Sequence, residues 1–242
     1  MKKFGLFLII ALALSACKKE PVLTLQQTSA TLKSGENFSI TATGFDSYQF
    51  TSEDEYVAKV SASGMVSAQR VGNTKIVVKA EDKVAYFSVN VIPEYVFFTE
   101  PITEWGMSRS QLISRLGTPS TSTADGVGYT SSSTIAPMSI YLFDANGLSV
   151  SSTIITTSYS SLLGSFMAER YYPFAYDSDE YSIYFINALS VSKATTIIAL
   201  GLYSTSYWMA VYIRNDNYTK GGLNSVNSEI FKKIDKIVQQ QK

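Results

Sequence analysis

The strongest constraint on the fold is an alternation of apolar and polar residues in the first third of the chain. Between residues 22 and 92, short segments carry an apolar side chain at every second position, and turn residues separate them; the longest series is Ala85, Phe87, Val89 and Val91. Alternation of this kind buries one face of a β-strand and exposes the other. About seven such strands in about 70 residues predict an all-β, immunoglobulin-like sandwich of two sheets.

Short motifs add detail to this prediction, among them Val57-Ala58-Lys59-Val60, Gly64-Met65-Val66-Ser67-Ala68 and Ile76-Val77-Val78. With these motifs, residues 22–93 resemble the bacterial immunoglobulin-like group 2 (Big_2) family. The family commonly has Trp where Phe50 stands here, so we expect that core position to be purely hydrophobic. The resemblance implies a spacer or an adhesive module, and the single copy favours a spacer.

The N-terminus carries the features of a secretory signal. Lys2 and Lys3 precede an apolar run from Phe4 to Leu14, which is followed by the small residues Ser15 and Ala16. Such a run is too short to span a membrane, which takes about 20 residues. A basic head, a short apolar stretch and a small-residue cleavage site predict a signal peptide over residues 1–16.

The single cysteine of the chain follows this segment directly. Leu14-Ser15-Ala16-Cys17 resembles the lipobox of bacterial lipoproteins, which implies a diacylglycerol on the thiol of Cys17, an acylated amino terminus, and a tether over residues 17–21. Several acyl chains are needed for stable anchoring. Lys18, in place of the Asp that retains lipoproteins at the inner membrane, favours the outer membrane, with its periplasmic and cell-surface faces both open. The alternative is an ordinary secretory signal with an unmodified cysteine.

Composition excludes several classes of function. Removal of the signal takes away Lys2 and Lys3 and leaves 18 basic against 20 acidic residues, and the chain contains no histidine. A near-neutral chain argues against nucleic-acid binding. Without imidazole, neither a Ser-His-Asp apparatus nor the usual zinc sites can form. We therefore expect no enzyme, no catalytic residue, no metal and no cofactor, with a carboxylate-dependent glycoside hydrolase as a distant third alternative.

From residue 94 onward the pattern changes to mixed helices and strands. Ser108 and Gln111 stand in capping-box spacing, and Gly117 and Pro119 favour the end of that helix. Further helices are predicted over 159–171 and 225–240, and strands over 127–131, 139–143, 148–155, 181–186, 194–202 and 207–214. This order predicts an α+β domain over residues 94–242, an antiparallel sheet with helices on one face.

Two resemblances bear on this second domain. Residues 139–155 are similar to residues 182–198, which indicates either a duplicated helix-plus-three-strand unit or a chance likeness of Ser- and Thr-rich strands. Residues 106–112 with Leu116-Gly117-Thr118-Pro119 resemble the opening of the small outer-membrane lipoproteins of the BamE (SmpA/OmlA) type. Their fold also occurs duplicated in a protein inhibitor of β-lactamase. The resemblance implies a binding or assembly role and carries over no functional residue.

Candidate ligand-binding residues lie among the aromatic side chains of the second domain. Trp208 and Tyr212 share one face of their strand, and Tyr184 is placed beside them from a neighbouring strand. If these side chains are exposed, they form a platform for a sugar or a protein partner. The alternative is that helices cover this face of the sheet and the side chains belong to the core. Four further tyrosines extend the aromatic group into a predicted loop, where burial is less expected: Tyr171, Tyr172, Tyr176 and Tyr181.

Charged groups offer weaker candidates. Asp177-Ser178-Asp179-Glu180 supplies too few ligands for a calcium loop, so a solvated turn is the better interpretation. A basic face on the last helix favours solvent over membrane contact, because Asp235 interrupts it: Lys232, Lys233, Lys236 and Lys242.

Together these features predict a lipid-anchored envelope protein, in which an immunoglobulin-like stalk presents a C-terminal protein-binding module. The alternative is a glycan-binding surface lipoprotein that uses an aromatic face. The expected partners are the membrane, through the lipid, and an envelope protein or a glycan.

Overall fold

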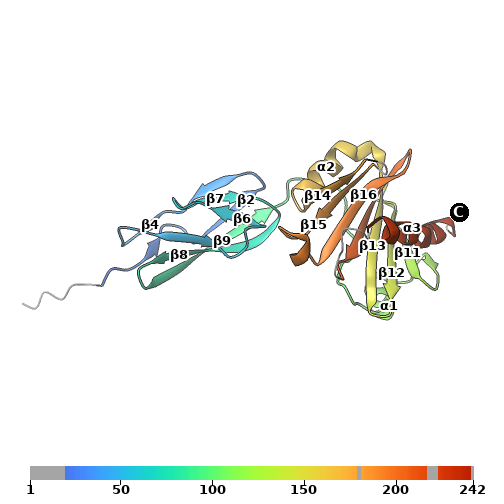
Figure 1. Ribbon diagram of the computed structural model, residues 1–242, viewed down its shortest axis with the longest axis horizontal. Helices are drawn as coiled ribbons and strands as arrows, with labels where there is room; N and C mark the ends of the chain where they lie inside the picture. The colour runs from blue at the N-terminus through green and yellow to red at the C-terminus, as the bar shows by residue number, and fades with distance from the viewer. Residues whose placement is uncertain (1–19, 179–180, 217–222, 241–242) are drawn as a thin grey trace, which may run out of the picture.

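The computed structural model of the protein describes residues 20–178, 181–216 and 223–240. The predicted signal peptide, Cys17, Asp179, Glu180 and Lys242 lie outside these residues. Figure 1 shows two units joined end to end, here called the Ig-like unit (residues 22–93) and the C-terminal unit (residues 94–240); their boundary stays a prediction. Within the described ranges, no helix has the length and apolar character needed to span a membrane.

The Ig-like unit is a sandwich, as the alternation predicts. One sheet has the strand order β2-β9-β8-β5, the facing sheet has the order β3-β7-β6, and β1 pairs with β4. The strands are β1 (Thr24–Leu25), β2 (Ser29–Lys33), β3 (Asn37–Ser39), β4 (Ala42–Thr43), β5 (Gln49–Ser52), β6 (Ala58–Val60), β7 (Met65–Ala68), β8 (Gly72–Ala80) and β9 (Lys83–Ile92).

The core of the Ig-like unit follows the period-two pattern. Phe87, Val89 and Val91 of β9 are buried against the facing sheet. Phe50 packs against this core, as expected, and limits the space at Gly64, where a Cβ atom would lie 2.8 Å from the Phe50 ring. Gly64 has a φ of +81°, so the backbone also favours glycine there.

The C-terminal unit is built on one antiparallel sheet of eight strands, in the order β10-β11-β12-β13-β17-β16-β15-β14. The strands are β10 (Thr121–Ser122), β11 (Gly126–Thr130), β12 (Met138–Asp144), β13 (Gly147–Thr156), β14 (Tyr172–Asp177), β15 (Ser182–Ile186), β16 (Thr196–Ser204) and β17 (Tyr207–Arg214). The α-helices are α1 (Arg109–Leu116), α2 (Ser160–Ala168) and α3 (Leu223–Gln239), with single 3-10 turns at Thr157–Tyr159 and Val191–Lys193.

The predicted capping box begins α1. The Gln111 backbone N–H donates to Ser108 Oγ at 3.2 Å, and the Ser108 backbone N–H donates to Gln111 Oε1 at 2.9 Å. Leu112 is the fully buried residue of this helix, whereas Leu116 is exposed.

The prediction of helices on one face of the sheet is wrong. α2 packs on the face that carries Ala210 and Tyr212 of β17, whereas α3 packs on the opposite face, that of Met209 and Val211. The reason is that the central strands are apolar on both faces, so each face requires a cover. α3 approaches the sheet closely at Gly126, where a Cβ atom would lie 3.1 Å from Ile237 Cδ1.

The repeat also differs from the prediction. Each half of the unit is a helix followed by four strands, because β10 and β14 add to the three predicted in each half, and β13 pairs with β17 where the halves meet. The similar segments 139–155 and 182–198 do not match as strands, since Val191–Lys193 forms a 3-10 turn where the first segment continues as β13. The order of helix and strands repeats in the two halves, but the similar segments of sequence do not occupy equivalent strands.

Candidate functional site

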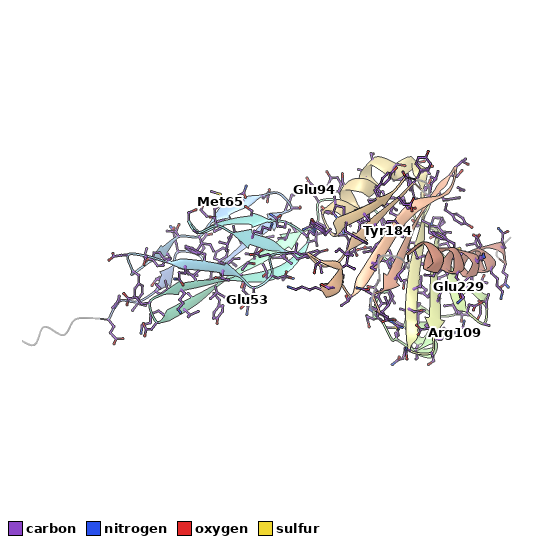
Figure 2. All side chains as sticks on the ribbon, viewed as in Figure 1. Glu53, Met65, Glu94, Arg109, Tyr184 and Glu229 are labelled. Carbon is purple, nitrogen blue, oxygen red and sulfur yellow. The ribbon has the colours of Figure 1, made fainter. Side chains whose placement is uncertain are left out.

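The predicted aromatic platform is absent, because two of its three members are buried on opposite faces of the sheet. Tyr212 has no exposed surface and Tyr184 is 2% exposed. The strand register explains the error: Tyr184 pairs with Ala199, which pairs with Val211, so Tyr184 lies on the face opposite Tyr212. Figure 2 labels Tyr184 within the C-terminal unit. A platform of Trp208, Tyr212 and Tyr184 is therefore wrong.

Tyr212 instead belongs to a hydrogen-bonded network below α2. The hydroxyls of Tyr212 and Tyr171 each donate to Glu100 Oε1 at 2.7 Å, and Arg170 Nε lies 3.6 Å from Glu100 Oε2. Burial, and then the charge of Glu100, raise the pKa of Tyr212 well above its ordinary value. Both phenols thus serve as neutral donors to a carboxylate, which is a structural role.

Of the three residues of the predicted platform, Trp208 alone is partly exposed. It packs at the margin of the α2 cluster, and its Nε1–H donates to Ser160 Oγ at 2.8 Å, at the start of α2. This bond fixes the indole plane, and the ring remains partly exposed beside Leu202, with which Trp208 is paired.

Four large apolar side chains on neighbouring strands are exposed or partly exposed on one face of the sheet. We call Tyr176, Ile183, Leu202 and Trp208 the edge surface. Tyr176 pairs with Ile183, Ile183 pairs with Leu200, and Leu202 pairs with Trp208, so all lie on the face that α2 covers only in part. Tyr176 is 62% exposed and Leu202 52% exposed. Grouped exposure of large apolar side chains is typical of an interaction site.

The position of the edge surface favours contact through side chains. β14 is the last strand of the sheet and has β15 as its one strand neighbour in the described chain. Pro173 has no N–H to offer to an added strand, and the register shifts between Pro173 and Ala175. Both features protect a sheet edge against strand addition. A partner would therefore lie across the face of the hairpin formed by β14 and β15.

The tyrosines that the sequence placed in a loop divide between surface and core. Tyr172 and Tyr176 are exposed and belong to strand β14, and Tyr181 is exposed in the turn before β15, with a φ of +49°. Tyr171 is held in the Glu100 network. The predicted exposure is thus confirmed for three of the four, although the loop is a strand that the sequence analysis missed.

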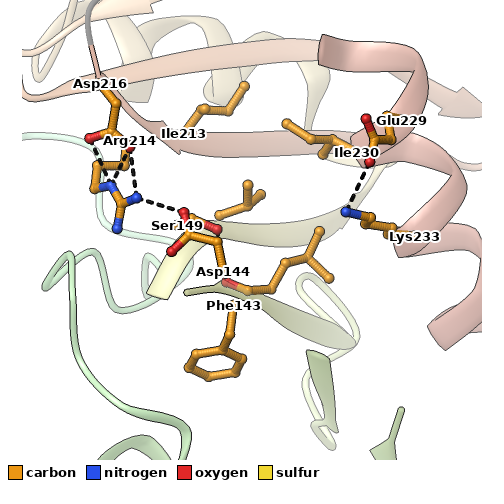
Figure 3. Close-up of a pocket in the computed structure, with 11 residues that line it drawn as sticks. Phe143, Asp144, Ser149, Ile213, Arg214, Asp216, Glu229, Ile230 and Lys233 are labelled. Carbon is orange, nitrogen blue, oxygen red and sulfur yellow. Dashed lines mark hydrogen bonds and ion pairs between the residues drawn. The ribbon is translucent and has the colours of Figure 1, made fainter. Parts of the chain in front are cut away.

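A pocket of about 240 Å³ lies between α3 and the ends of β12, β13 and β17. Figure 3 shows that Arg214 joins two carboxylates there, Asp144 at 2.6 Å and Asp216 at 2.7 Å, while Lys233 pairs with Glu229 at 3.1 Å. Because Asp144 and Asp216 share one guanidinium, neither stands free as the acid or base of a glycoside hydrolase. The charged side chains of this pocket are thus paired with one another, beside the aliphatic side chains of Leu142, Val150 and Ile230.

A larger groove of about 580 Å³ opens between the end of α3 and the β16–β17 hairpin. Its lining is mainly apolar and includes Met138, Ile154 and Val238. The Tyr203 hydroxyl donates to Asp235 Oδ1 at 2.8 Å, and burial together with this bond raises the pKa of Tyr203 to about 12. Both residues of this bond line the groove.

The remaining charged candidates that lie within the described residues show no metal-binding arrangement. In the part of the chain that the structure describes, no three His, Cys, Asp or Glu side chains are grouped to hold a metal ion. Of the predicted acidic turn, Asp179 and Glu180 lie outside that part. On α3, Lys236 lies 3.7 Å from Asp125, so the basic face of this helix is partly paired with the protein itself.

Comparisons with known proteins add little. No protein-family model and no curated protein sequence matches the chain. Among solved structures, domains 5-6 of the S-layer protein SbsC match 82% of this chain and 87% of that chain, at 16% identity and a TM-score of 0.27. The match to an EHEC O157:H7 intimin mutant covers 76% of this chain and 87% of the intimin chain, at 15% identity and a TM-score of 0.24. The match to human protocadherin-24 EC1-2 covers 80% of this chain and 94% of the protocadherin chain, at 15% identity and a TM-score of 0.24. Likenesses this low carry no argument about function.

Proposed function

We propose that this protein is a lipid-anchored protein of the bacterial outer membrane, in which the Ig-like unit is a stalk and the C-terminal unit, an α+β module, binds a partner protein. The lipobox Leu14-Ser15-Ala16-Cys17 supports the anchor. The observation that carries the binding role is the edge surface, where the large apolar side chains of Tyr176, Ile183 and Leu202 remain exposed on one face of the sheet.

The chemistry of the edge surface suits a protein partner. Trp and Tyr are enriched among the residues that dominate protein interfaces, and here they flank two aliphatic side chains that cannot bind a sugar by hydrogen bonds. Of the three residues of the platform that would have favoured a glycan, Tyr212 and Tyr184 are buried. The proposal therefore assigns no catalytic role and no cofactor, and treats glycan binding as an outcome of the test.

The anchor is tested by Cys17→Ala. If Cys17 carries the lipid, this variant moves from the membrane fraction to the soluble fraction, whereas Ser15→Ala, which keeps a small residue before the cysteine, stays with the membrane. Retention of the Cys17→Ala variant in the membrane fraction would contradict the anchor.

Binding is tested with the soluble chain from Glu20 to Lys242 as bait for an envelope extract, followed by titration of the purified partner. The double variant Tyr176→Ser with Leu202→Ser should weaken binding by about 30-fold or more, as loss of an interface hot spot does. The matched control is Tyr86→Ser, which alters a tyrosine of the Ig-like unit that is 55% exposed, and it should leave the affinity unchanged.

Other outcomes would overturn the binding proposal. Equal weakening by Tyr86→Ser would make the Ig-like unit the adhesive part. Binding on a glycan array that is lost in the double variant, with no protein captured, would favour the glycan-binding alternative.

A further inference from the structure

The junction between the two units centres on Glu169, directly after α2. Its carboxylate accepts the backbone N–H groups of Glu94 at 2.9 Å and of Tyr95 at 3.1 Å, and it pairs with Arg170. The Glu169 side chain is 5% exposed. Glu94 and Tyr95 follow the last strand of the Ig-like unit, so this carboxylate holds the connecting segment at its start; Figure 2 labels Glu94 between the units.

A second contact comes from loops of the Ig-like unit. The Val71 backbone N–H donates to the carbonyl of Glu169 at 2.8 Å. The Tyr56 hydroxyl lies 2.6 Å from the carbonyl oxygen of Arg170 and 3.2 Å from that of Ile186. Burial raises the pKa of Tyr56, so the phenol stays a neutral donor to these carbonyl groups.

A third contact is made by the side chain of Arg70. Its guanidinium lies 5.0 Å from the ring centre of Tyr56 and 4.9 Å from that of Tyr172, so a cation of the Ig-like unit is placed between one ring of each unit. Cation–π contacts of this kind are strongest when partly desolvated. Tyr172 is the first residue of β14, the strand that carries Tyr176 of the edge surface.

We infer that the Ig-like unit holds the C-terminal unit in one fixed orientation, through a clamp made by Tyr56, Arg70, Val71 and the start of the connecting segment on residues 169–172. Two loops of the Ig-like unit, at Tyr56 and at Arg70–Val71, and the segment that follows its last strand all contact residues 169–172. Contacts at three separate points fix both the angle and the rotation between two bodies. Domains joined by a flexible linker and a small polar interface move relative to each other by default. This inference does not depend on the proposed binding role.

The clamp also gives the stalk a second task. Because Arg70 and Tyr56 contact Tyr172, Arg170 and Ile186, they hold one end of the β14–β15 hairpin. Tyr56 and Arg70 are thus positioning residues for the strand beneath the edge surface, and the Ig-like unit is more than a spacer.

Pulsed electron spin resonance tests the clamp directly. The chain from Lys18 to Lys242 contains no cysteine, so spin labels can be attached at Lys79→Cys in the Ig-like unit and at Ser114→Cys on α1, two exposed positions. We expect one narrow distance distribution. Arg70→Ala combined with Tyr56→Phe should broaden it, while circular dichroism shows that both units stay folded.

Hydrogen exchange supplies the second readout. Tyr56→Phe keeps the ring and removes the hydroxyl, so the amides of residues 172 and 174–176 should exchange roughly fivefold faster, the effect of losing about one hydrogen bond. The control is Tyr48→Phe, since that hydroxyl bonds Phe45 within the Ig-like unit. A broad distance distribution in the unaltered chain, or a narrow one that the double variant leaves unchanged, would overturn the inference.

Discussion

The Ig-like unit buries almost nothing but apolar side chains, whereas the C-terminal unit buries hydroxyl groups on both faces of its sheet and the carboxyl group of Glu169 beside α2. Thr74 is the buried polar residue of the Ig-like unit among those described, against seven in the C-terminal unit, Glu169 among them. Apolar burial is non-directional, so a core of that kind tolerates small shifts. Buried polar groups need partners in defined places, and they make the structure of the C-terminal unit more specific and more sensitive to single changes.

The largest expected effect tests the apolar side of this comparison. Phe87→Ala removes a fully buried ring from the Ig-like core and should lower the free energy of unfolding by about 3–5 kcal/mol. Tyr86→Ala, one residue earlier and exposed, should change it by less than about 0.5 kcal/mol. Urea unfolding measures both. Similar losses for the two variants would mean that the alternation does not define the core.

The next effect tests the polar side. Glu169→Ala leaves two backbone N–H groups without their acceptor and removes one partner of Arg170, which keeps Glu100. We expect a loss of about 2–3 kcal/mol in the free energy of unfolding. Glu94→Gln, which breaks an exposed ion pair with Lys33, should cost less than about 1 kcal/mol in the same measurement. If Glu169→Ala lowers the free energy of unfolding no more than Glu94→Gln does, the buried carboxylate at the junction is not a source of the difference between the two units.

A smaller effect carries a pH signature. Burial and Glu100 raise the pKa of Tyr212, so folding favours its neutral phenol. The resulting stability is fully present below the ordinary tyrosine pKa of about 10 and is lost as the pH rises above it. Tyr212→Phe should cost about 1–2 kcal/mol at neutral pH and make the alkaline loss less steep. An unchanged slope between about pH 9 and 11 would contradict this.

The smallest effect concerns the edge surface. Leu202→Ser creates no cavity, because about half of this side chain is already exposed to solvent. The free energy of unfolding should therefore change by less than about 0.5 kcal/mol. Leu200→Ser, two residues earlier and buried under α2, should destabilise far more. Thermal unfolding of the pair checks this, and strong destabilisation by Leu202→Ser would make that side chain part of the core.

The two units also differ in how far sequence predicts them. Alternation identifies the buried side chains of the Ig-like unit, since each strand has one solvent-exposed face. In the C-terminal unit, β17 matches its predicted bounds, but both of its faces are apolar, so the sequence does not show where α2 and α3 pack.

Two errors at the candidate site have separate physical causes. Tyr184 was assigned to the wrong face because pairing register between strands is set by three-dimensional contacts, and a shift of one residue reverses the face. β14 was missed because Pro173 and a register shift interrupt its pattern. The tyrosines of that segment and Trp208 were the signals in the sequence that pointed to the edge surface.

The parallel pairing of β2 with β9 has a mechanical consequence. The two strands run in the same direction over five residue pairs, from Ser29 with Ser88 to Lys33 with Ile92. A force between the two ends of the Ig-like unit would therefore pull β2 and β9 past each other along their length and load all of their hydrogen bonds at once. Forced unfolding is governed by the rate of crossing the unfolding barrier, and such a shear geometry raises that barrier relative to strands that open one bond at a time. A protein held at one end and bound at the other would transmit tension through this pair.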